Sequence, residues 1–202
     1  LRTYTTLLEL SAEDMKLLDP MITEAAKLTT GDSAVSLYSD KRFPMAMHTV
    51  TKVADLAAFR TVNKKLLALL VPHIWSRVVA ELKANGTDLP PAQVSSIAEM
   101  VALAKPFATP MGVVPTLISN ETDGVQVDAL ELKIDWTVLS REMGLAAEDV
   151  KTVDMLKSVA GDTIVLAVAS GSDRYVQAFG PNAIATATSL AKGEDPKTSE
   201  AV

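Results

Sequence analysis

The sequence predicts an α+β fold, in which an N-terminal helical bundle precedes a smaller region with an antiparallel or mixed sheet and flanking helices. Two observations predict it. In the first half of the 202-residue chain, apolar residues recur at spacings of three and four, as they do along the buried side of a helix. In the second half the spacing becomes two, which is typical of a half-buried strand.

The first helices are predicted from their start and stop signals. Ser11 and Asp14 have the spacing of a capping box, with Asp in place of the usual Glu or Gln. Asp19 and Pro20 mark a second start, because Asp is a good N-cap and Pro suits the first helical position. Gly31 then ends this helical stretch by supplying a left-handed cap.

Three further helices are predicted before the middle of the chain. The first covers residues 44–71, with Met47 and Val50 among the residues of its inner face. Pro72 lacks an amide donor and disfavours helix at the residue before it, so a separate helix is expected to follow. The third covers residues 92–105, where apolar residues again recur at helical spacing.

A segment rich in proline follows. Pro106, Pro110, Gly112 and Pro115 lie within ten residues, which is too dense for the interior of a regular element. This segment is either a domain boundary or a long surface loop inside one domain. We take the first reading and expect four parts: a helical domain (1–105), a Pro-rich linker or arm (106–116), a small α+β region (117–191) and a flexible tail (192–202).

Strand patterns appear in the second half. Residues 130–136 alternate between apolar and charged, which predicts a strand. Val125 and Val127 alternate in the opposite phase, and a bulge near Ala129 would reconcile the two.

A hairpin and two kinds of helix complete the prediction. Residues 163–169 and 174–179 flank a turn-forming Ser-Gly-Ser-Asp sequence, which predicts a β-hairpin. An Ala-rich helix is expected over residues 183–191. Residues 139–153 have the apolar spacing and turn glycine of two short packed helices. The second of these is too acidic to approach DNA phosphates, so we interpret the pair as structural.

Composition excludes several kinds of chemistry. The chain has no cysteine and two histidines, which excludes disulfides, thiol nucleophiles and thiolate metal sites. His48 and His73 lack a carboxylate at ligand spacing. Glu131 and Asp135 would lie about 13 Å apart along a strand, too far for a glycosidase pair. We therefore predict no catalytic, cofactor-binding or metal-binding residues, no cofactor, and a protein that is more consistent with a non-enzyme.

The net charge of −6 conceals an asymmetry. Residues 41–83 hold eight basic and two acidic residues, whereas residues 111–202 hold seven basic and fourteen acidic ones. The basic segment is expected to contact a polyanion, to pair with the acidic half of the same chain or of a neighbouring copy, or to form an ordinary solvated surface. The candidate contact residues are Lys52, Arg60, Lys64, Lys65 and Arg77 on the basic side, and Asp128, Glu131, Asp135, Glu148, Asp149 and Asp154 on the acidic side.

These features favour a self-assembling structural protein, such as a viral or phage coat subunit that packs head-to-tail and contacts nucleic acid through a basic helical face. The expected partners are other copies of the chain and nucleic acid backbone, and the expected location is the virion or the cytoplasm. The longest apolar runs are too short to span a membrane. Two alternatives stay open: a small-ligand binder or enzyme with its site near residues 106–115, and a protein-interaction adaptor.

Overall fold

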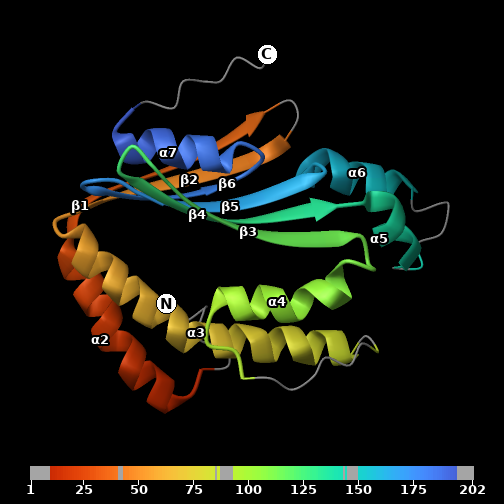
Figure 1. Ribbon diagram of the computed structural model, residues 1–202, viewed down its shortest axis with the longest axis horizontal. Coiled ribbons are helices and arrows are strands. Elements are labelled where there is room, and N and C mark those ends of the chain that lie inside the picture. The colour runs from red at the N-terminus through yellow and green to blue at the C-terminus, as the bar shows by residue number, and fades with distance from the viewer. Residues whose placement is uncertain are drawn as a thin grey trace. The chain divides into compact units, whose positions relative to one another are not determined.

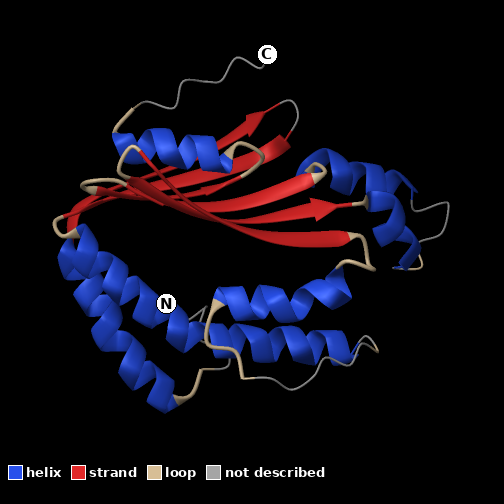
Figure 2. Cartoon of the chain, viewed as in Figure 1, coloured by secondary structure: helices blue, strands red, loops and turns tan. Residues whose placement is uncertain are grey.

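The computed structural model describes residues 10–40, 43–84, 86, 93–142, 144 and 150–194. Helices and strands are interspersed along these residues, mostly as pairs of strands between helices (Figure 2). The predicted α+β class is therefore confirmed, but an N-terminal helical bundle is not, because two strands lie between the first two helices. The elements in order are α2 (Ala12–Leu28), β1 (Thr29–Asp40), β2 (Phe43–Val53), α3 (Leu56–Ala84), α4 (Ile97–Ala108), β3 (Val113–Thr122), β4 (Val125–Ile134), α5 (Trp136–Glu142), α6 (Val150–Ala160), β5 (Thr163–Ser170), β6 (Arg174–Phe179) and α7 (Ala183–Lys192).

The chain forms two compact units. The helical unit comprises Leu1–Leu28 and Ala57–Leu103, and the sheet unit comprises Thr29–Leu56 and Ala104–Val202. Strands β1 and β2 thus belong with the C-terminal strands, although they lie between two helices of the other unit in sequence. Helix α4 begins in the helical unit and ends in the sheet unit. Among the described residues, no helix combines the length and the apolarity that crossing a bilayer requires.

The helical unit begins with the predicted capping box. The backbone N–H of Ser11 donates to Asp14 Oδ2 at 2.9 Å, and the Asp14 N–H donates back to Ser11 Oγ at 3.1 Å. Nε2 of His73 on α3 lies 3.4 Å from the same Asp14 oxygen, so this cap also connects α2 to α3. The second start predicted at Asp19 and Pro20 is wrong, because α2 is continuous through both residues.

The helix break predicted at Pro72 is also wrong. α3 extends over 29 residues with Pro72 inside it. Val71 and Trp75, on either side of the proline, are buried at 1% and 3% exposure. Their burial contributes free energy that offsets the backbone hydrogen bond lost at proline.

The described residues of the sheet unit form six strands in the order β1-β2-β6-β5-β4-β3, and every neighbouring pair is antiparallel. Helix α7 lies across one face of this sheet (Figure 1). Small and β-branched residues form the core between them, which allows the helix to approach closely. The members of this core are Val125, Val127, Ala129, Val165, Ala167, Ala169, Val176, Ala178, Ala183, Ala187, Leu190 and Ala191.

The predicted helix over residues 44–71 is wrong in its first part, which forms β2. Buried Ala46 and His48 alternate along this strand with exposed Met47 and half-buried Thr49. The two-residue period and the threonines and valines of this segment are typical of a strand. Val50 and Val53 are three residues apart, and this local coincidence with helical spacing produced the wrong prediction.

The hairpin is confirmed: β5 and β6 pair from Leu166–Phe179 to Ser170–Tyr175. The Ala-rich helix is confirmed as α7, and the short helix pair as α5 and α6. Gly144, after α5, adopts the positive φ of 65° that its place in the turn sequence required. Of the predicted tail, residues 195–202 lie outside the described part of the chain.

No bulge interrupts β4. Its pairing with β3 and β5 is regular through Ala129. The change of phase has another cause, which is that β4 presents apolar residues to both faces. Val125, Val127 and Ala129 pack under α7, whereas Leu130 and Leu132 lie on the opposite face.

The proline-rich segment is largely regular structure. Pro106 lies inside α4, and Pro115 lies inside β3 at the edge of the sheet. The backbone N–H of Ile134 donates to the carbonyl of Asp162 at 2.9 Å, so the even-numbered residues of β4 bond to β5 and the odd-numbered ones bond to β3. The β3 residues paired with those odd-numbered residues are even-numbered, so the N–H and C=O groups of the odd-numbered residues of β3 point away from β4. The missing N–H of buried Pro115 thus points away from β4, so no bond within the sheet is lost.

Candidate functional site

One apolar side chain from each of the six strands lies in a single line on the sheet face opposite α7. We call this line the apolar row. Neighbouring members are directly paired in the register of adjacent strands. In the order of the strands, the row consists of Leu37, Met47, Phe179, Leu166, Leu130 and Leu117.

Much of the apolar row is exposed. Leu37 is 69% exposed, Leu166 47%, Met47 44% and Leu117 41%, while Leu130 and Phe179 are half-buried. Isolated exposed leucines are common on protein surfaces, whereas large contiguous apolar patches are typical of interaction sites.

The line of residues beside the apolar row carries very little charge. It consists of Val35, Thr49, Gln177, Val168, Asp128 and Ser119, again one from each strand. Asp128 is its single charged residue, and Asp128 Oδ1 accepts a hydrogen bond from Ser119 Oγ at 2.6 Å. Neither line contains a lysine or arginine, so this part of the face suits an apolar partner rather than a polyanion.

In the part of the chain that the structure describes, β1 and β3 are the edge strands of the sheet. The N–H of Val53 donates to Asp173 next to β6 at 2.8 Å, so odd-numbered positions of β2 bond to β6 and even-numbered ones bond to β1. In β1, the even-numbered positions therefore bond inward. The backbone N–H and C=O groups of Ser33, Val35 and Leu37 point toward the free edge.

A cleft of about 540 Å³ lies elsewhere in the sheet unit. It forms where β4 ends and α5 begins, and its walls include Thr109, Gly112 and Val114 from the proline-rich segment. The polar side chains on its lining are Lys133, Asp135, Lys157 and Asp162, together with two threonines. This mixture of charges offers hydrogen bonds to a small polar molecule.

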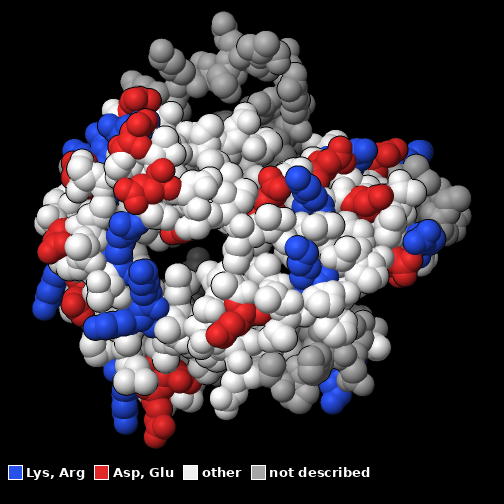
Figure 3. Space-filling view, viewed as in Figure 1, with Lys and Arg blue, Asp and Glu red and all other residues white. Residues whose placement is uncertain are grey.

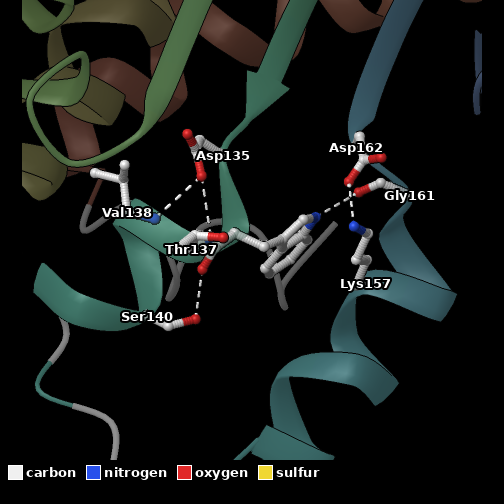
Figure 4. Close-up of polar contacts among 8 residues, drawn as sticks. Asp135, Thr137, Val138, Ser140, Lys157, Gly161 and Asp162 are labelled. Carbon is white, nitrogen blue, oxygen red and sulfur yellow. Dashed lines mark hydrogen bonds and ion pairs between the residues drawn. The ribbon is translucent and has the colours of Figure 1, made fainter.

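Most polar groups of the cleft have structural contacts (Figure 4). Asp135 Oδ1 accepts the N–H groups of Thr137 at 3.0 Å and Val138 at 3.1 Å, which makes Asp135 the N-cap of α5. Lys157 Nζ lies 3.4 Å from Asp162 Oδ1. The expected arrangement of Asp135 on the same strand as Glu131 is wrong, because β4 ends one residue earlier.

The basic candidates do not form one surface. Arg60 and Lys64 are one turn apart on α3, whereas Arg77 is rotated by roughly 140° from Lys64 around the helix. Arg77 Nη2 also lies 3.4 Å from Glu81 Oε1. Lys65 is exposed on α3, and Lys52 belongs to β2 in the other unit. On the face that Figure 3 shows, basic and acidic side chains lie next to one another at several places.

The acidic candidates are dispersed as well. Glu131 Oε1 lies 3.3 Å from Lys133 Nζ on the same strand, and Asp128 and Asp135 make the contacts described above. Asp154 is exposed on α6. Glu148 and Asp149 lie outside the described residues.

Five of the described titratable groups have displaced pKa values: Asp14, His48, Glu99, Asp123 and Lys192. Hydrogen bonds from Ser11 lower the pKa of Asp14, with a smaller contribution from His73. Burial lowers the pKa of His48, which lies on β2 at 8% exposure. The described residues bring together no group of three or more His, Asp or Glu that would hold a metal ion.

The apolar row could not be predicted from the sequence, because its members are far apart in the chain and are aligned only by strand register. A usable signal was present in β4 and β5, where apolar residues occupy both phases of the alternation. A strand of this kind has apolar residues on both faces, although one helix covers one face only.

The fold and these surfaces define an α+β protein with a helix-covered antiparallel sheet. Comparison with known proteins found no match for the chain among protein-family models, curated proteins or solved structures.

Proposed function

We propose that this chain is a self-assembling structural protein whose copies meet through the sheet face that carries the apolar row. The observation that carries the proposal is the row itself, a line of six apolar side chains of which four are more than 40% exposed. Covering this line removes apolar surface from water, which is the main driving force of protein association.

A second copy of the chain suits this face better than a charged partner. The row and the line beside it present Thr, Ser, Gln and apolar side chains, with Asp128 alone carrying charge. Two such faces pack against each other without burying a cation. Asp128 itself is already hydrogen-bonded to Ser119.

A viral or phage coat subunit in the virion or the cytoplasm is the narrower form of this proposal. Arg60, Lys64 and Lys65 of α3 support it, since they offer three cations to a nucleic acid backbone within two turns of helix. Head-to-tail packing of basic on acidic segments has less support, because Glu131 and Asp135 already make contacts within the chain.

Electron microscopy and the ultraviolet absorbance ratio of the native material test both forms. We expect particles of regular size. Absorbance dominated by nucleic acid would support the coat subunit, whereas particles with the absorbance of protein alone would overturn that narrower form. Dispersed material of single-chain size at high protein concentration would contradict self-assembly altogether.

Small-ligand binding in the cleft is the second candidate function. A volume of about 540 Å³ is within the range of small-molecule sites, and residues 109–114 contribute to its lining. A ligand at one hundred times its Kd would stabilise the fold by about 2.7 kcal/mol. A screen of metabolites by thermal unfolding tests this, and Lys157→Ala serves as the cleft variant. A shift that persists in Lys157→Ala would place the ligand elsewhere.

A further inference from the structure

We propose that two copies of this chain join edge to edge through β1, antiparallel to each other, with Val35 of both copies at the two-fold axis. This inference rests on the proposed self-assembly and identifies its partner and a second interface. An extended assembly needs such an interface in addition to the apolar row, because a single two-fold contact closes after two copies.

The free edge of β1 supplies hydrogen-bonding groups that fit a second copy of the same strand. Ser33, Val35 and Leu37 direct their N–H and C=O groups outward. In an antiparallel pair centred on Val35, Ser33 of each copy faces Leu37 of the other. Two bonds from each of three residue pairs give about six hydrogen bonds across the edge.

The side chains of this edge also suit the pairing. Val35 is 67% exposed and Leu37 69%, and both lie on the face that carries the apolar row. Val35 would meet Val35 of the second copy directly, and Leu37 would lie diagonal to it, within contact distance. Leu37 ends the apolar row at this edge, so the pairing places the rows of both copies on the same face of one continuous sheet, offset along the strands.

The opposite edge of the sheet is protected, whereas β1 is not. On β3, outward-facing Pro115 lacks an N–H and would leave a gap in any new ladder. The stretch from Ser33 to Leu37 contains no proline and no charged residue, and such residues are the usual protection of a free edge. This asymmetry favours β1 against β1 over a head-to-tail contact of β1 with β3.

Cysteine cross-linking of the full chain tests the pairing, since the native sequence has no cysteine. Directly opposed residues of a bonded pair have Cα atoms about 5.5 Å apart, which a disulfide spans. Under a mild oxidant we expect Val35→Cys to form a covalent dimer. The matched control is Glu121→Cys, which lies outward and exposed on β3, outside the apolar row, and should form no covalent dimer under the same conditions.

A non-covalent variant gives an independent measurement. Val35→Pro removes an outward N–H while leaving the bonds between β1 and β2 in place, as Pro115 does on β3. Loss of one donor from each copy should weaken dimerisation about thirtyfold. Glu121→Pro, which removes an outward N–H from β3 outside the apolar row, is the control and should leave the dissociation constant unchanged. A melting temperature equal to that of the native chain confirms that Val35→Pro folds.

The outcomes separate this inference from the proposed function. If the native chain associates but Val35→Cys stays reduced and Val35→Pro associates normally, the β1 pairing is wrong and self-assembly stands. A mixed disulfide between Val35→Cys and Glu121→Cys would replace the two-fold pairing with a head-to-tail one. A native chain that is monomeric at every concentration would overturn both.

Discussion

The substitution Leu166→Thr tests whether the apolar row holds copies together. Leu166 lies in the middle of the row, on a central strand, and is 47% exposed. Burying a fully exposed leucine contributes about 1.5–3 kcal/mol, so covering the exposed part of Leu166 contributes about 1 kcal/mol per copy. A symmetric contact uses this residue twice, which amounts to about 2 kcal/mol.

Threonine has the β-branched shape that a strand favours and supplies one methyl group. We therefore expect Leu166→Thr to raise the dissociation constant of self-association by about tenfold, rather than the full thirtyfold that 2 kcal/mol implies. Sedimentation velocity over a range of concentrations measures this constant. Thermal unfolding of the variant at low concentration should stay close to that of the native chain.

Leu156→Thr is the matched control. Leu156 is 41% exposed on α6 and does not belong to the row. It should leave association unchanged. Equal dissociation constants for Leu166→Thr and the native chain would refute the reasoning, as would equal weakening by both variants, because the effect would then belong to exposed leucines in general.

Three further predictions concern stability. Gly171→Ala should lower the free energy of unfolding by about 2–3 kcal/mol in chemical denaturation, because the new Cβ would overlap the backbone carbonyl of Ala191 at the end of α7. An unchanged free energy of unfolding would mean that α7 does not pack against Gly171. Ser11→Ala should raise the pKa of Asp14 toward its ordinary value in an NMR titration. The native cap should contribute fully to stability above about pH 4, and this contribution should fade as the pH drops through the lowered pKa of Asp14. A titration curve identical to that of the native chain would argue against the capping box. His48 has a lowered pKa in the folded state, so its contribution to stability should be complete above about pH 6.5 and decline as pH falls from there toward the lowered value. His48→Gln should flatten the pH dependence of the melting temperature between pH 5 and pH 7, and an unaltered slope would assign that dependence to other groups.

Local signals in the sequence predicted local structure well. The Ser-Gly-Ser-Asp turn placed the hairpin of β5 and β6, and the spacing of Ser11 and Asp14 placed the start of α2, because each signal acts over a few residues. Pro72 and Pro115 show where local rules fail. The cost of a proline depends on the partner that its absent N–H would have had, and only the packed structure determines that partner.

The candidate surfaces depend on register and could not be found in this way. Leu37 and Leu117 are eighty residues apart in the chain and stand at opposite ends of one row. They are aligned through four intervening strands, each with its own register. The charge asymmetry was visible in the sequence, but the fold distributes Lys52 and Arg60 between two units and turns Arg77 away from Lys64. Net charge along a segment therefore overstated the charge of any one surface.

The weight-average mass of the native chain as a function of concentration, measured by sedimentation equilibrium, tests the central claim most directly. We expect the weight-average mass to rise well above the single-chain value of 21.5 kDa as concentration increases. We also expect the rise to persist at high salt, since the apolar row carries no charge. A mass that stays at the single-chain value at all concentrations would contradict the claim.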